Sequence, residues 1–334
     1  TTTAIGGVTV SDKVLPLLTM KELYAPVTFG GAEAPAYGKV ICSGVGASSD
    51  SDVFATGTEN GVEVVVPLAN VELTYGVYHN DSNDKLILDL NGHTLTRVDG
   101  DASNGESNNG AFYRGRGELT IRDSAGGGEL NGGTITANSI DDLISVSGKL
   151  TVEGGRLVAG TASRSKDISG SAAVKAADAG AEISVSNAIL IGGAATGDEN
   201  ASYVEGGAAL TFDRGAKLTL SNATLTGGAV TGTGAENSVS GGAAVEILGS
   251  ETTVAELSDI TAMGGKASGN GNCEGGAAII IDGTSKARVT LTDIKADGGE
   301  NAGAAEYASG GAALSIETTK TEANITVNGS ESVY

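Results

Sequence analysis

The pattern of apolar and polar residues along this chain is that of short strands separated by glycine-rich turns. In the stretch from Gly206 to Gly228, residues 209–212 form an apolar run, and residues 217–221 and 223–226 alternate between polar and apolar positions. Alternation with a period of two is the signature of a β-strand. The repeats do not place apolar residues at the three-and-four spacing of a helix over ten positions. The pattern therefore predicts three short strands in each unit and an all-β fold.

The same unit recurs at a fixed period. The phrase Gly-Gly-Ala-Ala followed by an aliphatic residue begins at Gly206, Gly241, Gly275 and Gly310, at separations of 35, 34 and 35 residues. A period of this size is typical of repeat architectures, in which each coil is stabilised by burying its inner face against its neighbours. We therefore expect a parallel β-helix, or β-solenoid, with roughly 35 residues per coil and like strands stacked about 4.8 Å apart.

A polar corner residue follows an alternating strand in each coil. Asn and Asp are favoured at such corners because their side chains cap nearby backbone groups and tolerate left-handed conformations. Eight positions fit this role, which predicts about eight coils and a polar ladder along one edge of the solenoid. They are Asn91, Asp123, Glu153, Asn187, Asn222, Asp259, Asp293 and Asn328.

The repeat does not cover the whole chain. Residues 1–58 lack it and are interpreted as an N-terminal cap or assembly segment, with an apolar strand at residues 3–10, whereas residues 59–334 are interpreted as the β-helix. Polar stretches precede each Gly-Gly-Ala-Ala phrase and are interpreted as long loops on one side of the rod. Insertions confined to one face of a solenoid often form its binding face, and tolerated decoration is the alternative. These stretches are residues 194–205, 229–240, 266–274 and 300–309.

Composition favours a narrow core. Glycine accounts for 53 of the 334 residues, aromatic residues for 4%, and there is no tryptophan.

The net charge of −21 indicates a self-repelling, exposed surface and argues against binding to nucleic acid or to an anionic membrane. Apolar runs fall short of the roughly 18 residues of a spanning helix, so membrane insertion is not expected. Cys42 and Cys273 are expected to be free or buried thiols, because a disulfide framework needs more cysteines; a long-range bridge between them is the alternative.

Two stretches carry a resemblance to known proteins. They are residues 85–97, KLILDLNGHTLTR, and the alternation of GGAA with TLSNATLTGG. In these features residues 61–334 resemble the right-handed parallel β-helix superfamily with the pectin-lyase-like fold, and within it secreted bacterial β-helix adhesins with GGA-type repeats. The resemblance implies an adhesive or structural role at a surface, although polysaccharide lyases and hydrolases share the fold.

A catalytic site is not expected. Hydrolases of that fold carry a Gly-His-Gly element, whereas here Thr94 follows His93, and the Arg-x-Lys element at residues 164–166 lies in a polar loop. Asp141 and Asp142 are the candidate carboxylate pair of the alternative, a polysaccharide-degrading enzyme. Adjacent residues of a strand point to opposite faces, which argues against joint action by these two side chains.

Three acidic, oxygen-rich loops are candidates for Ca²⁺ binding, at residues 50–52, 80–84 and 198–200. Solvated loops that bind no metal are the alternative, and no cofactor is expected. The two histidines, His79 and His93, are expected at a turn and a corner in contact with solvent.

The sequence leads to two functional hypotheses. The first is a secreted, non-enzymatic structural or adhesive subunit at the cell surface, which assembles head to tail into a homopolymeric filament. An unfinished last coil exposes unpaired backbone groups, and head-to-tail contacts generate filaments. Removal of a targeting segment is one expected explanation for a start at Thr1 without a methionine. The residues expected at this contact are Ile5, Val8, Val10, Ile325, Val327, Val333 and Tyr334.

The alternative hypothesis is a glycan-binding or polysaccharide-degrading β-helix protein, with a host or matrix glycan as its partner. A third interpretation is that the chain is a passenger fragment of a longer adhesin.

Overall fold

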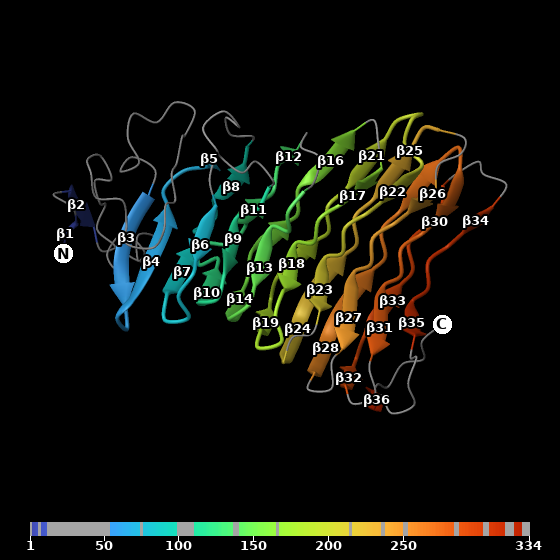
Figure 1. The fold of residues 1–334 in the computed structure, drawn as a ribbon. Coiled ribbons are helices and arrows are strands. Elements are labelled where there is room, and N and C mark those ends of the chain that lie inside the picture. Colours follow the sequence, from blue (N-terminus) through green and yellow to red (C-terminus); the bar gives the residue numbers. More distant parts are fainter. Residues whose placement is uncertain are drawn as a thin grey trace.

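The described part of the chain is a parallel β-solenoid in which like strands of successive coils lie side by side (Figure 1). It consists of strands, turns and connecting segments, without a helix among the described residues. The solenoid has about six turns of about 34 residues, fewer than the eight expected. The computed structural model describes residues 2–5, 8–11, 54–73, 76–98, 110–135, 140–164, 167–213, 216–234, 238–249, 253–283, 287–302, 307–317 and 324–328.

The largest sheet forms two flanks of the solenoid, which meet at the corner residues. The first flank contains β3 (Phe54–Glu59), β4 (Val62–Pro67), β7 (Lys85–Asp89), β10 (Glu118–Arg122), β14 (Lys149–Glu153), β19 (Glu182–Ser186), β24 (Lys217–Thr226), β28 (Val254–Met263), β32 (Arg288–Thr292) and β36 (Asn324–Asn328). The second flank contains β5 (Val71–Leu73), β8 (Thr94–Arg97), β11 (Glu129–Asn131), β15 (Arg156–Val158), β20 (Ile189–Ile191), the second halves of β24 and β28, and β33 (Lys295–Asp297).

The third flank of the main coil is a separate sheet. It contains β6 (Val77–His79), β9 (Tyr113–Gly115), β13 (Ile144–Val146), β18 (Val174–Ala176), β23 (Leu210–Asp213), β27 (Val245–Gly249), β31 (Ile279–Gly283) and β35 (Leu314–Glu317). A two-stranded sheet, β1 (Thr2–Ile5) and β2 (Val8–Ser11), is described separately.

The main core is a column of stacked aliphatic side chains. Leu119, Leu150, Ile183 and Leu218 are register partners in successive strands of the first flank, and each is almost completely buried. Each coil contributes only a few such side chains, so its neighbours supply the rest of its apolar environment. This arrangement explains how a chain with so few aromatic residues forms a continuous core.

The outer face of the first flank carries a column of alternating charge. Lys85, Glu118, Lys149, Glu182 and Lys217 occupy equivalent positions in five successive strands. The Lys85 ammonium lies 3.0 Å from the Glu118 carboxylate, and both side chains are about half exposed. Exposed pairs of this kind contribute little stability each. Their order instead favours one register, since opposite charges directly across neighbouring strands are favourable and like charges are not.

The expected long loops are strands with a core of their own, so that expectation was wrong. From the coil of β15 to the coil of β28, the chain leaves the main body on one short strand and returns on another, and both strands pair in parallel with those of neighbouring coils. We call the result the lateral lobe; it runs along the upper side of the solenoid in Figure 1. The outgoing strands are β12 (Thr134–Ile135), β16 (Thr161–Arg164), β21 (Ala195–Gly197), β25 (Val230–Gly232) and β29 (Ala267–Gly269). The returning strands are β17 (Ile168–Ser169), β22 (Tyr203–Glu205), β26 (Ser238–Ser240), β30 (Asn272–Glu274) and β34 (Ala308–Ser309).

The lobe core is built from one small or medium apolar residue per strand. The outgoing strands contribute Ala195 and Val230, and the returning strands contribute Val204, Val239 and Cys273, all at most 2% exposed. Cys273 is a free, buried thiol, and burial raises its pKa. Its thiol is therefore kept in the unreactive protonated form. Cys42 lies outside the described residues.

Paired glycines form the junction between the lobe and the main coil, which we call the glycine neck. Outgoing and returning segments of successive coils alternate there, and each is joined to the next by a backbone hydrogen bond. The Gly228 N–H donates to Gly207 O (2.8 Å), Gly242 to Gly228 (2.9 Å), and Gly265 to Gly242 (2.8 Å). A methyl group on Gly242 would lie 2.1 Å from the Gly207 oxygen, so only glycine fits. The neck consists of residue pairs 192–193, 206–207, 227–228, 241–242, 264–265, 275–276, 298–299 and 310–311.

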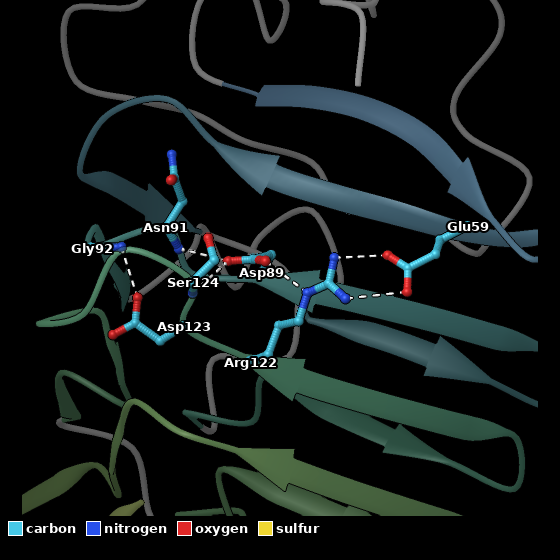
Figure 2. Close-up of polar contacts among 7 residues, drawn as sticks. All are labelled: Glu59, Asp89, Asn91, Gly92, Arg122, Asp123 and Ser124. Atoms are coloured by element: carbon cyan, nitrogen blue, oxygen red, sulfur yellow. Dashed lines mark hydrogen bonds and ion pairs between the residues drawn. The ribbon is translucent and has the colours of Figure 1, made fainter. Parts of the chain in front are cut away.

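An antiparallel hairpin and a partly buried ion cluster lie at the N-terminal end of the described solenoid. Strand β3 pairs antiparallel with β4, so five residues assigned to the cap segment belong to the solenoid sheet. Figure 2 shows Arg122 bonded to two carboxylates, Asp89 at 2.7 Å and Glu59 at 2.9 Å. Asp89 is fully buried and also accepts the backbone N–H of Ser124 at 3.1 Å. Burial alone would lower the pKa of the Arg122 guanidinium, but its hydrogen bonds to Glu59 and Asp89 raise it above the ordinary value.

Candidate functional site

The junction between the third flank and the returning strands of the lobe carries a row of polar side chains. Lys175, Thr211 and Glu246 occupy one outward column of the third flank. The Thr211 hydroxyl donates to the Glu246 carboxylate at 3.2 Å, and Lys175 lies 3.6 Å from Asp142. Glu205 of β22 is close enough for its charge to act on Glu246. We call Asp142, Lys175, Thr211, Glu205 and Glu246 the carboxyl row.

Two carboxyl groups of this row have shifted acidity. Burial raises the pKa of Asp142, with Asp141 adding to the effect and Lys175 opposing it. Burial also raises the pKa of Glu246, and the charge of Glu205 raises it further. Raised carboxyl pKa values are frequent at functional sites, where such groups donate protons or hydrogen bonds. The row therefore holds two carboxyl groups, Asp142 and Glu246, whose protonated form is favoured by burial.

The geometry of the row does not form a glycosidase pair from Asp142 and Glu246. Their coils are separated by three strand spacings, since Ile144, Val174, Leu210 and Val245 are successive register partners. Three spacings amount to about 14 Å, beyond the roughly 5–9.5 Å between the carboxyl groups of retaining and inverting glycosidases. Asp141 and Asp142 lie in the segment just before β13, not within a strand as expected.

A hollow of about 360 Å³ lies over the last three returning strands of the lobe. Ser238, Asn272 and Tyr307 stand at equivalent positions of adjacent strands there, and Tyr307 is 70% exposed. Tyr203 continues this column next to Ser238, and burial followed by a hydrogen bond to Glu205 raises its pKa. The complete lining is Ser238, Val239, Ser240, Asn272, Cys273, Glu274, Tyr307, Ala308 and Ser309.

The C-terminal end of the main core is open in the described part of the chain. Ile316 and Val327 are 47% and 55% exposed, whereas their register partners in the preceding coil, Ile281 and Leu291, are 1% and 2% exposed. The same columns are thus buried inside the stack and exposed at its end. This end presents both apolar side chains and an edge of strands β35 and β36.

The corner residues divide into two groups. Asn91, Asn187, Asn222, Asp259 and Asp293 have φ between 46° and 53°, which is the left-handed conformation. The Asn222 amide also donates to the Asn187 oxygen at 2.7 Å, across adjacent coils.

Two of the expected corner residues lie one position early. Glu153 is the register partner of Arg122, and Asn328 is the register partner of Thr292, so both are strand residues that precede the corner. Gly154, with φ of 131°, follows Glu153 at the turn. Asp123 caps the turn differently, since its carboxylate accepts the N–H groups of Gly92 (2.8 Å) and Gly128 (2.7 Å); Figure 2 shows the first of these bonds.

The expected N-terminal assembly strand is a hairpin instead. Residues 3–10 were expected as one free strand, but Thr3 pairs with Val10 and Ile5 with Val8 in the antiparallel pair β1–β2. The paired glycines at positions 6 and 7 explain the difference, because Gly-Gly between two apolar runs is a hairpin signal. Ile325 and Val327 lie in β36, and Val333 and Tyr334 lie outside the described residues.

The expected position of His79 was also wrong. Its side chain is 1% exposed and packs edge-on against Tyr113, with the ring nitrogen Nδ1 at 3.3 Å from the tyrosine hydroxyl. Burial lowers the pKa of His79, against the opposing charge of Asp84, and burial also raises the pKa of Tyr113. The proximity of Gly115, where a methyl group would lie 2.7 Å from the Tyr113 oxygen, explains this packing.

The acidic loops use their carboxylates to form turns. Asp81 accepts the N–H of Asn83 at 2.9 Å, and Asp198 accepts the N–H of Asn200 at 2.8 Å. Within the described ranges there is no group of three or more His, Cys, Asp or Glu residues placed to hold a metal ion. The loop at residues 50–52 lies outside those ranges. The described residues also contain no helix long and apolar enough to cross a bilayer.

Comparison of the chain with protein-family models, with curated proteins and with solved structures finds no match in any of the three. The fold is therefore established by the strand register alone, and the likeness to GGA-type adhesins remains a proposal.

Proposed function

We propose that this chain is a non-enzymatic structural or adhesive β-helix subunit that assembles end to end into an extracellular filament. The observation that carries the proposal is the end of the core formed by β35 and β36, which is open in the described part of the chain and where Ile316 and Val327 are about half exposed. Exposed strand edges with apolar side chains are templates for pairing with another chain. The acidic, glycine-rich repeats support a place among secreted β-helix adhesins of the pectin-lyase-like fold, at the cell surface.

The strand directions define how two copies would meet. All first-flank strands from β4 to β36 run parallel, and β3 alone runs antiparallel to them at the opposite end. A second copy stacked in the same orientation presents its β3 antiparallel to β36. This contact joins two different surfaces, so it does not close on itself and extends into a filament.

The test is electron microscopy and sedimentation of the purified chain over a range of concentrations. The variant I316K/V327K places two charges in the open end and should remain unassembled. Thr326→Lys is the matched control, because Thr326 is an exposed neighbour of Val327 in β36 that faces outward rather than into the core column. We expect filaments from the wild-type and control proteins. A wild-type protein that stays monomeric at every concentration would refute the proposal.

A second candidate function is glycan binding, favoured by the hollow beside Tyr307. Exposed tyrosine rings together with Ser, Asn and Glu side chains provide the apolar faces and hydrogen-bonding groups that bind sugars. Titration with acidic and neutral polysaccharides should show binding that Tyr307→Ala weakens. The variant D141N/D142N separates binding from degradation, since only a polysaccharide-degrading activity that used these carboxylates would be lost with it.

A further inference from the structure

The outer face of the second flank carries an apolar patch, which we call the lateral patch. Ile189 and Met263 are 43% and 38% exposed, and the residues between them on the surface are partly exposed. Thr224 and Thr226 lie between them and add methyl groups to the same surface. The patch consists of Val158, Ile189, Ile191, Thr224, Thr226, Thr261 and Met263.

The strand register arranges this face in two columns. The first column runs Arg156, Ile189, Thr224, Thr261 and Lys295. The second column runs Val158, Ile191, Thr226, Met263 and Asp297. Three successive strands in the middle have no charged residue at these positions, and a Lys–Asp pair on β33 follows them at one end.

This arrangement differs from the first flank of the same coils. There the equivalent outward positions hold Glu182 and Lys217, whereas the second flank presents Ile189 and Thr224. Contiguous exposed apolar patches that are rimmed by polar residues mark interaction sites.

We propose that the lateral patch binds the lateral patch of a second copy, around a two-fold axis parallel to the solenoid axis. Such an axis keeps equivalent coils at the same height and exchanges the columns, so the first column of one copy faces the second column of the other. Ile189 then lies opposite Ile191 of the second copy, and Lys295 lies opposite Asp297 of the second copy. By symmetry each dimer contains two such Lys–Asp contacts.

The charges select this arrangement over the antiparallel one. A two-fold axis perpendicular to the solenoid, through the coil of Thr224, reverses the order of coils and leaves each column facing itself. Lys295 would then face Arg156, and Asp297 would face Val158. Arg156 is already paired with Glu129, so the antiparallel pairing leaves both Lys295 and Asp297 without an opposite charge, whereas the parallel pairing gives each of them one.

Lateral pairing is independent of end-to-end assembly, because it involves the outer face of the second flank and not the ends of the solenoid. Together with the Lys–Asp pair on β33, the lateral patch spans five strands, about 19 Å along the axis. A contact of this size is weak between two single chains, but it repeats along a filament, where linked contacts increase the overall affinity. Binding of a second copy at the lateral patch would therefore hold filaments side by side as well as pair free subunits.

The test is sedimentation velocity of the whole chain in the I316K/V327K background, which removes the end contact. We expect self-association that Lys295→Glu and Asp297→Lys each weaken by about tenfold or more, because each creates two like-charge contacts per dimer. Both changes lie on exposed side chains, and unchanged circular dichroism and melting temperature serve as the check on folding.

The decisive result is recovery. An equimolar mixture of the two single variants should associate as the wild type does, since the carboxylate introduced at position 295 of one would face the ammonium introduced at position 297 of the other. The double swap K295E/D297K should recover for the same reason. Association of the single variants equal to that of the starting protein would overturn the proposal. So would failure of the mixture to recover, or a starting protein that remains monomeric up to about 200 µM. Loss of filaments in I316K/V327K with lateral pairing retained would separate the two assembly modes.

Discussion

The glycine neck provides the sharpest test of the fold, through the substitution Gly242→Ala. The added methyl group would lie 2.1 Å from the Gly207 oxygen and 2.7 Å from its carbonyl carbon. Both are backbone atoms held in place by neighbouring coils, so no side chain can move aside. The neck must open at this level, which separates the Gly242 N–H from Gly228 O and the Gly265 N–H from Gly242 O.

The expected cost follows from these two effects. Overpacking of a closely packed region costs about 1–3 kcal/mol, and a buried backbone group that loses its partner costs about 1–3 kcal/mol. Together they give about 4 kcal/mol for one methyl group. Gly180 offers a matched control, because nothing lies within 4 Å of a methyl group added there. Gly180→Ala should be neutral or stabilise by about 0.4–1 kcal/mol, through the lower entropy of the unfolded chain.

The assay is guanidinium denaturation of both variants, combined with hydrogen exchange of the lobe amides. Nearest-neighbour coupling in repeat proteins allows the lobe to open locally before the whole solenoid unfolds. We expect Gly242→Ala to lose exchange protection around β25 and β26 and to unfold at a lower denaturant concentration. Equal midpoints and equal protection for the two variants would refute the close-contact explanation of the paired glycines.

Three further predictions concern buried ionisable groups. Because burial lowers the pKa of His79, the unfolded chain binds its proton more readily, so stability should fall as pH drops below 6.5; melting curves of the wild type and of His79→Phe should diverge in that range. Arg122→Met leaves the buried Asp89 carboxylate without its cation and should destabilise the chain by about 3 kcal/mol, measured by denaturation at pH 7. Because the pKa of Glu246 is raised, its charged form is unfavourable in the fold at neutral pH; Glu246→Gln should therefore raise the melting temperature at pH 7, and this gain should shrink as pH falls through the raised pKa. A lower melting temperature for the Gln variant at pH 7 would contradict the assigned cause.

The sequence pattern predicted that the chain winds into stacked coils, but it did not align the corner residue of every coil correctly. Strands such as residues 217–221 alternate clearly, and Asn187 and Asn222 mark the turns because few residues other than Gly adopt a left-handed backbone. The alignment at Glu153 failed because two glycines follow it, and these take over the turn without an Asn or Asp. The alignment at Asn328 failed by one residue, because Asn328 is the last residue of strand β36 and precedes the corner.

The lateral lobe escaped prediction because its strands are too short to show alternation. Each contributes a single buried residue among Gly, Thr and Ser, and parallel pairing with neighbouring coils is what makes the segment a strand. A signal was nonetheless present, since an aliphatic residue or Cys recurs near the end of each stretch at Val204, Val239 and Cys273. The lateral patch and the carboxyl row could not be predicted from the sequence either, because both depend on which residues of different coils become neighbours.

The alternating column from Lys85 to Lys217 has a consequence for how such a gene can grow or shrink. Deleting one of the three inner coils of this column, those of Glu118, Lys149 and Glu182, would set lysine beside lysine or glutamate beside glutamate, and duplicating any one coil would do the same. Gain or loss of two coils at once preserves the alternation. Length variants of this segment that arise by recombination should therefore persist in steps of two repeats.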